Sequence, residues 1–271
     1  MTDTNDYLNK LAVSNPLVEP LIRSAIQVLK LPSGSRGLDA GCGIGLQALL
    51  LSKAVGPTGH VTGLDICPEF LLHAEELVKK AGLSEQISFK EGDVCKLPFN
   101  DNTFDWVWSS CCVGYASFLE PLSSLKELAR VVKPGGSVAI FVWSSENLLP
   151  GYPQLKARLD MTSPGIAPFA TGKRPESHFL RALGWFRKAG LERPAAQTFA
   201  GSAYAPLADD VRQALISLFE MRWSGVESEL KGKELAEYQR LCLPESSEFI
   251  LNEPDYYAFF TCSMFYGRVT E

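Results

Sequence analysis

Residues 37–45 of this 271-residue chain read GLDAGCGIG, and this stretch decides the fold. It ends a short apolar segment and leads into LQALLLSKAVG, a pattern typical of a strand that turns into a helix. Gly41, Gly43 and Gly45 allow the backbone of the turn to approach a ligand without interference from Cβ atoms. The spacing is GxGxG, whereas dinucleotide-dependent oxidoreductases use GxGxxG. The turn therefore predicts a site for a nucleotide-like ligand, and its spacing argues against a dinucleotide.

Aspartates stand at the ends of the first three expected strands. Asp39 lies two residues before the first glycine of the turn, where a carboxylate attracts a cationic group and repels a pyrophosphate. Asp65 ends the second strand, where it can accept hydrogen bonds from both ribose hydroxyls; the alternative is an N-cap for the next helix. Asp93 ends the third strand and could accept a hydrogen bond from an adenine amino group, or be only a turn residue after Gly92.

Strands and helices alternate regularly between residues 36 and 143. The strands are expected at 36–41, 60–66, 86–93, 104–110 and 137–143, the helices at 46–56, 68–82 and 122–132, and the turn KPGG at 133–136. A further helix is expected at 17–31, where Leu21, Ile22, Ala25, Ile26 and Leu29 form one apolar stripe. Five strands that alternate with helices imply an α/β fold with a parallel sheet covered on both faces.

The alternation becomes irregular after Trp143. The next segments are a Pro-rich excursion, a helix, a strand, a region of helical patterns and an aromatic closing strand inside the sheet, expected at 144–176, 178–191, 195–204, 207–243 and 255–269. The length favours a single domain over 1–271. Within it, 33–143 is expected to be the cofactor-binding half, and 144–176 and 207–252 are expected to be insertions that cover the substrate.

Five segments in a fixed order resemble the class I methyltransferases, within them the branch of the ubiquinone and menaquinone biosynthesis methyltransferases. These segments are GLDAGCGIG, VTGLDICPEF, GDVCKLPF, FDWVWSS and ELARVVKPGGSVAI, and together they cover about residues 35–143. The resemblance implies a Rossmann-like, doubly wound sheet of seven strands, mostly parallel with an antiparallel last strand. It also implies S-adenosylmethionine as the methyl donor and S-adenosylhomocysteine as the product.

The resemblance implies a role for each part of the site. Asp39 and the glycine turn are expected to face the methionine moiety, Asp65 the ribose, and Asp93 with Val94 the adenine, while Ser109 to Cys111 form the substrate edge. Cys42 departs slightly from the family, which places several small residues at that position. The residues expected to bind the cofactor are Asp39, Gly41, Cys42, Gly43, Gly45, Asp65, Ile66, Gly92, Asp93, Val94, Ser109 and Ser110.

Catalytic residues are not identified by the sequence, because methyl transfer from a sulfonium can proceed by alignment and exclusion of water. If a base is needed, His178 is one candidate, with local hydrogen bonds near a helix start as the alternative. Tyr115 is a candidate for lining the acceptor pocket, with core packing as the alternative. The seven cysteines show no CxxC or Cys/His ligand spacing, so neither a metal site nor a disulfide framework is expected.

The net charge of −5 and a pI near 5.4 give no basic footprint for nucleic acid. No apolar run is long enough to span a membrane, and the protein is expected to be cytoplasmic, with a small-molecule methyl acceptor. The sequence does not predict an oligomeric state. Two alternatives remain: a non-catalytic S-adenosylmethionine-binding module, and an NAD-dependent oxidoreductase, which the GxGxG spacing and Asp39 disfavour.

Overall fold

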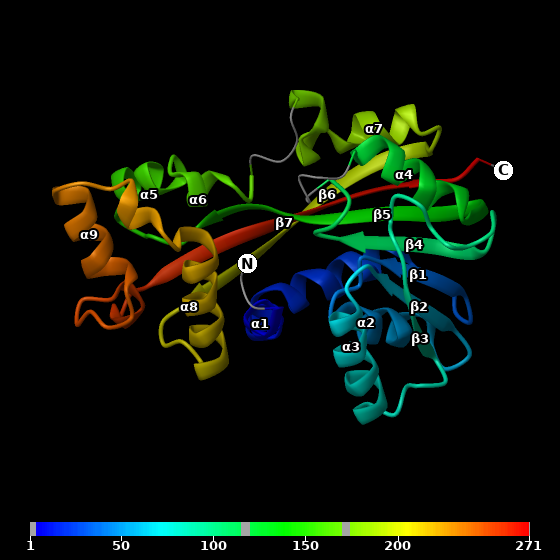
Figure 1. Cartoon of the computed structure of the whole chain (residues 1–271), viewed down its shortest axis with the longest axis horizontal. Coiled ribbons are helices and arrows are strands. Elements are labelled where there is room, and N and C mark those ends of the chain that lie inside the picture. The colour runs from blue at the N-terminus through cyan, green and yellow to red at the C-terminus, as the bar shows by residue number, and fades with distance from the viewer. Residues whose placement is uncertain (1–3, 115–119, 170–173, 271) are drawn as a thin grey trace. The chain divides into compact units, whose positions relative to one another are not determined.

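The centre of the molecule is a seven-stranded sheet with the strand order β3-β2-β1-β4-β5-β7-β6. The structure is a computed structural model that describes residues 4–114, 120–169 and 174–270 (Figure 1). The strands are β1 (Arg36–Ala40), β2 (His60–Asp65), β3 (Ile87–Glu91), β4 (Phe104–Ser110), β5 (Val132–Asn147), β6 (Glu192–Tyr204) and β7 (Tyr257–Arg268). The five strands expected between residues 36 and 143 are all present.

The direction of the strands agrees with the expected topology. Strand β1 pairs in parallel with β2 and β4, β2 with β3, and β4 with β5. At the other end of the sheet, Gly135 N donates to Val269 O and Val269 N donates to Gly136 O, each at 2.9 Å. These bonds join the start of β5 to the end of β7, so β7 runs antiparallel to β5. The closing strand lies between β5 and β6, which confirms that it sits inside the sheet.

The described residues divide into two compact units. The first unit contains the described parts of 1–21, 144–170 and 200–261, and the second unit contains those of 22–143, 171–199 and 262–271. The residue at which the chain first passes from the second unit to the first is Ser144, the expected start of the first insertion. The single domain and the substrate-covering role of the insertions stay predictions.

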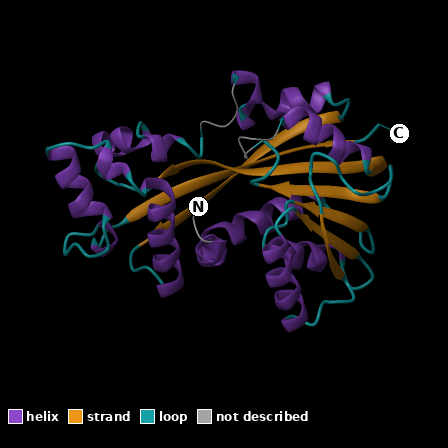
Figure 2. Cartoon of the chain, in the orientation of Figure 1, coloured by secondary structure: helices purple, strands orange, loops and turns teal. Residues whose placement is uncertain are grey.

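Helices flank the strands of the second unit, as Figure 2 shows by colour. These helices are α2 (Leu46–Val55), α3 (Pro68–Lys80), α4 (Pro121–Arg130) and α7 (Ala182–Lys188). Helix α2 illustrates why they form, because Ala48, Leu51 and Val55 lie on one stripe and are fully buried. Each of these side chains adds apolar area to the core, which favours folding by about 25 cal/mol per Å² removed from water.

Helix α1 (Thr4–Leu29) starts 13 residues earlier than expected. The prediction of a start at residue 17 was wrong: the helix runs through Pro16 as well as through Pro20, which already lay inside the expected range. Proline usually ends a helix, but here the two missing N–H donors remove only a small part of the hydrogen bonds of a 26-residue helix. The expected apolar stripe is confirmed: Leu21, Ile22, Ala25 and Ile26 are buried, and Leu29 is half-buried.

Several other boundaries also differ from the expectation; for example, β3 ends at Glu91, two residues earlier than expected. The KPGG segment is part of the continuous strand β5, which also extends beyond Trp143. Gly135 has a left-handed φ, and the register of β5 with β4 is irregular between Phe104 and Trp106. The helix expected at 178–191 is divided into a 3₁₀ turn (Phe179–Arg181) and α7. Strand β6 begins at Glu192, three residues earlier than expected.

The first unit is rich in helices. They are α5 (Pro153–Asp160), α6 (Ser163–Ile166), α8 (Asp209–Trp223) and α9 (Lys233–Cys242). The helical patterns expected at 207–243 are therefore confirmed as α8 and α9. Within this unit Arg222 of α8 donates from Nε to both carboxylate oxygens of Glu146, and both side chains are at most 9% exposed. Among the described residues, no helix has the length and apolarity needed to cross a bilayer.

The order of the parallel strands creates a switch point in the second unit. From β1 the chain moves to β2 and β3 on one side, then returns to β4 on the other side of β1. In open α/β sheets a ligand binds outside the carboxyl ends of the strands at such a point. The relevant edge of the sheet is therefore formed by the ends of β1, β2 and β4.

Candidate functional site

The strand register brings the expected site residues to one edge of the sheet. Asp39 of β1 pairs with Gly63 of β2 on one side and with Trp108 of β4 on the other. Asp65 is two residues beyond Gly63, and Ser109 is one residue beyond Trp108. The glycine turn after β1, Asp65 and the end of β4 are thus neighbours in the second unit.

The glycine turn adopts a backbone that other residues disfavour. Gly41, Gly43 and Gly45 have φ values of 78°, 52° and 78°, in the left-handed region. Space adds a second restriction, because a Cβ atom on Gly41 would lie 2.6 Å from Cys112 Sγ, and one on Gly45 would lie 2.8 Å from the Cβ of Ala74. The turn therefore requires glycine for both backbone conformation and packing.

Asp65 holds the glycine turn in place. Its Oδ2 accepts a hydrogen bond from Gly43 N at 2.8 Å, and its Oδ1 accepts one from Cys67 N at 3.1 Å. The N-cap residue of α3 is Cys67, so Asp65 is not the helix cap that was its alternative. Because a carboxylate oxygen has two lone pairs, each oxygen of Asp65 can accept a further hydrogen bond from a ligand.

Asp39 is a buried carboxylate, with only 1% of its surface exposed. Its Oδ2 has no hydrogen-bond partner among the described residues. Burial, and then the negative charge of Asp65, raise the pKa of Asp39 to about 8. An unpartnered buried acceptor is costly, so the site favours a cation or a donor beside this oxygen.

Two thiols lie at the glycine turn: Cys42 is part of the turn, and Cys112 lies close to Gly41. Cys42 is 8% exposed, and burial raises the pKa of its thiol far above the ordinary value. Burial also raises the pKa of Cys112 to about 12. Both thiols are therefore protonated at neutral pH and act as small apolar groups rather than nucleophiles.

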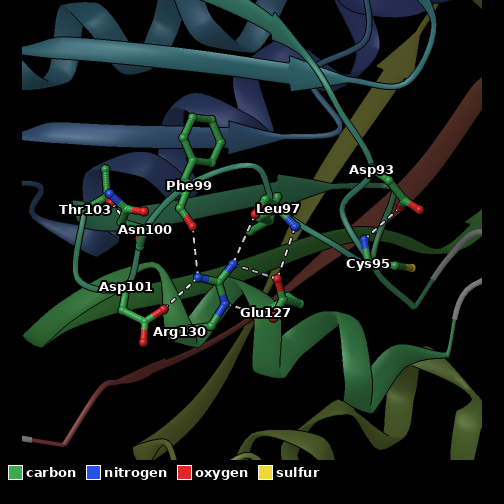
Figure 3. A network of polar contacts seen from close by, with 9 residues as sticks. All are labelled: Asp93, Cys95, Leu97, Phe99, Asn100, Asp101, Thr103, Glu127 and Arg130. Atoms are coloured by element: carbon green, nitrogen blue, oxygen red, sulfur yellow. Dashed lines mark hydrogen bonds and ion pairs between the residues drawn. The ribbon is translucent and has the colours of Figure 1, made fainter.

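Asp93 was expected to end the third strand, but β3 ends at Glu91 and Asp93 lies in the loop that connects β3 to β4 (Figure 3). Its Oδ1 accepts a hydrogen bond from Cys95 N at 2.8 Å, so the turn role that was its alternative is present. The carboxylate is exposed and Oδ2 remains accessible to a ligand, while the next residue, Val94, is buried. Gly92 N donates to Asp65 O at 3.0 Å, which ties this loop to the end of β2.

The remaining expected residues occupy different environments. Ile66 is 65% exposed beside Asp65, Ser109 is buried and Ser110 is half-buried at the end of β4. His178 precedes a 3₁₀ turn; its Nδ1 accepts from Leu180 N at 3.2 Å and its ring stacks on the adjacent Phe179. These contacts are the local ones expected if His178 only makes hydrogen bonds near a helix start, and its role as a base stays a prediction. Tyr115 lies outside the described residues.

Three contributors to the site were missed by sequence reasoning. Cys112 packs against Gly41, and Trp108 donates from Nε1 to Gln47 Oε1 at 2.6 Å, which ties β4 to the first turn of α2. Arg130 fastens the loop after Asp93 through several hydrogen bonds (Figure 3). The adjacency of Cys112 to the expected substrate edge was a usable signal, whereas nothing in the sequence pairs Gln47 with Trp108.

The comparisons with known proteins agree with this geometry. Residues 38–140 match a family model described as a methyltransferase domain. Over these residues the chain is similar to the class I S-adenosylmethionine-dependent methyltransferases. The residues matched by the methyltransferase model include the turn, Asp65, Asp93 and the end of β4.

Individual known proteins resemble the chain over different lengths. A demethylmenaquinone methyltransferase of Bacillus cytotoxicus is 37% identical over 155 residues, which are 57% of this chain and 63% of that protein. The match thus spans less than two thirds of this curated relative. The YcgJ protein of Bacillus subtilis has a TM-score of 0.56 at 17% identity, covering 92% of this chain and 98% of that one.

A third comparison includes a ligand. The phosphoethanolamine N-methyltransferase 2 of Haemonchus contortus, solved with phosphomonomethylethanolamine and S-adenosylhomocysteine, has a TM-score of 0.53 at 18% identity and covers 92% of this chain and 53% of that one. At these identities the two solved structures support the fold alone. The expected Rossmann-like fold is confirmed.

Proposed function

We propose that this chain transfers the methyl group of S-adenosylmethionine to a small quinone-type acceptor. The observation that carries the proposal is the buried Asp39 carboxylate beside the glycine turn, with an Oδ2 atom that lacks a hydrogen-bond partner among the described residues. A ligand with an ammonium group and a sulfonium supplies the positive charge that this carboxylate needs. A pyrophosphate would place negative charge there, which argues against NAD.

The residues around Asp39 fit the other parts of S-adenosylmethionine. The glycine turn offers close backbone approach for the methionine moiety. Asp65, already fixed by two backbone amides, has lone pairs left for the ribose hydroxyls. Asp93 and Val94 provide an exposed carboxylate and a buried apolar side chain for the adenine.

When bound, the sulfonium supplies an activated methyl carbon. In the reaction the S–CH₃ bond breaks, its electron pair stays on sulfur, and the acceptor atom forms the new bond to carbon. The acceptor then loses its proton. The protein's own part is to align donor and acceptor and to exclude water, which accounts for a large share of the rate in such displacements.

The acceptor class is inferred from the curated relatives, which are named demethylmenaquinone methyltransferases. A quinone in its reduced, hydroquinone form has an electron-rich ring carbon that can attack the methyl group. The predicted insertions at 144–176 and 207–252 are proposed to enclose this apolar ring, since pockets for small ligands are concave and mostly apolar.

The experiment is a measurement of S-adenosylhomocysteine release against a panel of short-chain demethylmenaquinols, phenols, amines and thiols. The expected result is turnover with the quinols and much slower release with the others. Release with amines but not quinols would contradict the acceptor class. Tight binding of S-adenosylmethionine without turnover across the panel would favour a non-catalytic binding module instead.

A further inference from the structure

The loop from Gly92 to Thr103 has little regular structure of its own. It connects β3 to β4 in the second unit, and its one bridge joins Asp93 to Lys96. A loop without a ladder of backbone hydrogen bonds needs other contacts to hold one conformation. This matters here because Asp93 and Val94, at its start, are the residues proposed to contact the adenine.

Arg130, the last residue of α4, fastens the middle of this loop. Its guanidinium donates from Nη2 to Leu97 O at 3.1 Å and from Nη1 to Phe99 O at 2.9 Å (Figure 3). Nη1 also donates to the carboxylate of Asp101 at 2.7 Å. A planar fork of donors with fixed directions is a property of arginine that lysine lacks.

Glu127, one helical turn earlier, completes the arrangement. It accepts hydrogen bonds from Arg130 Nε and Nη2, at 2.9 and 2.8 Å, and its Oε2 also accepts one from Leu97 N at 3.1 Å. The hydrogen bonds from Arg130 keep the pKa of Glu127 below its ordinary value. Leu97 is therefore held at both its N–H and its carbonyl oxygen.

The same helix end also holds the C-terminal end of the loop. Asn102 N donates to Arg130 O at 3.1 Å, and Thr103 N donates to Val131 O at 2.8 Å. Nearer to the adenine residues, the side chains of Cys95 and Ser124 are 3.4 Å apart.

We propose that Arg130 and Glu127 are positioning residues for adenine recognition, since they lock the loop that carries Asp93 and Val94. This inference rests on the proposed function. The arginine does not touch the cofactor in this scheme. It acts by fixing two carbonyl oxygens of the loop, so that the conformation of Asp93 is already selected before the ligand binds.

The test compares the binding of S-adenosylhomocysteine with that of S-inosylhomocysteine, in which hypoxanthine replaces adenine. Titration calorimetry on the full chain gives the ratio of the two dissociation constants. The wild type is expected to prefer the adenine compound, and Arg130→Lys is expected to reduce this preference about tenfold, through loss of the charge-assisted hydrogen bonds that fix the loop. Glu127→Gln is expected to reduce it in the same direction, and the exposed Arg187→Met is the matched control that leaves it unchanged.

The outcomes separate the inference from the function on which it rests. If the wild type binds with an adenine preference and both variants keep that preference, even with weaker binding overall, the positioning role is overturned and the proposed function stands. If the wild type binds neither compound, the proposed function itself fails. Should Arg130→Lys not fold, Glu127→Gln decides: the amides of residues 93–97 and of Phe99 must exchange with deuterium faster in that variant for the inference to hold.

Discussion

At the scale of the residue, Asp39 shows how burial makes a carboxylate selective for a cation. Its pKa of about 8 is set by desolvation first and by the charge of Asp65 second. At neutral pH the free protein therefore carries Asp39 largely as the neutral acid. Binding of a positively charged ligand favours the ionised form, so ligand binding and proton release are coupled.

This coupling predicts a pH dependence of binding. Between pH 6 and 8 the affinity for S-adenosylmethionine should rise by up to about tenfold per pH unit and then level off, because Asp39 must lose its proton to pair with the ligand. Calorimetry across this range measures the slope. Asp39→Asn should resemble the wild type at pH 6 and bind more weakly at pH 8, with no slope; an unchanged slope would show that another group titrates.

In the ligand-free protein the titration of Asp39 has the opposite effect: folding stability falls as the pH rises, whereas ligand affinity increases. The folded-state pKa of Asp39 is raised above the unfolded value of 3.8, so the folded state binds the proton more tightly. The stability from this proton is fully present below pH 4 and is lost as the pH rises through about 8. In Asp39→Asn, urea denaturation should show that this decline is absent.

Asp65 tests the ribose assignment. Asp65→Ala should weaken S-adenosylmethionine binding by roughly 1–3 kcal/mol, as expected for lost charge-assisted hydrogen bonds. Some stability is also lost, because Gly43 N and Cys67 N lose their acceptor. Glu75→Ala, an exposed change on α3, is the control. Equal affinity of Asp65→Ala and the wild type would remove Asp65 from the ribose site.

At the scale of the element, the alternation of strand and helix patterns in the sequence predicted most of the strands and helices of the second unit. The strands from β1 to β4 and helices α2, α3 and α4 lie within a few residues of their expected positions, because their apolar periods are regular and Gly or Pro marks their ends. The start of α1 and the course of β5 were not predictable in this way. Pro16 and KPGG are local signals for a break, but α1 and β5 continue through them.

The site was predictable only in part, for a similar reason. Asp39 and Asp65 lie near the ends of β1 and β2, and Asp93 follows β3; because these strand ends meet at one edge, the proximity of the three residues follows from parallel pairing. Cys112 and Arg130 act through contacts between residues far apart in the chain. Such contacts carry no local pattern: Arg130 and Phe99 are 31 residues apart.

The glycine turn after β1 also leads to a prediction about the stability of the fold. Gly41→Ala should lower the free energy of unfolding by about 2–4 kcal/mol, from left-handed backbone strain and the contact with Cys112. Gly82→Ala is a matched control, because Gly82 also has a positive φ, 69°, but a Cβ there would meet nothing within 4 Å. Chemical denaturation measures both. Equal losses of unfolding free energy in the two variants would mean that the turn accommodates the extra methyl group without additional strain.

At the scale of the whole molecule, the two units divide the proposed roles. All described residues proposed to contact the cofactor belong to the second unit, whereas the segments 144–169 and 207–252, proposed to enclose the acceptor, belong to the first. The first unit also contains the buried ion pair of Glu146 and Arg222.

This division predicts separate effects on stability and on cofactor affinity. Arg222→Met should lower the stability of the first unit by about 3–5 kcal/mol, because it leaves the Glu146 charge buried and unpaired. The affinity for S-adenosylhomocysteine should change less than twofold or so. Hydrogen exchange and calorimetry measure the two effects, and the double variant Glu146→Leu with Arg222→Met should recover most of the stability. A large loss of affinity would contradict the division of roles.

The most direct test of the central claim is titration calorimetry of the full chain with S-adenosylmethionine and, separately, with NADH at pH 8. We expect one molecule of S-adenosylmethionine to bind per chain, with weaker binding in Asp39→Asn, and no binding of NADH. Binding of NADH together with no response to S-adenosylmethionine would contradict the assignment of the glycine turn and Asp39 to a methyl-donor site.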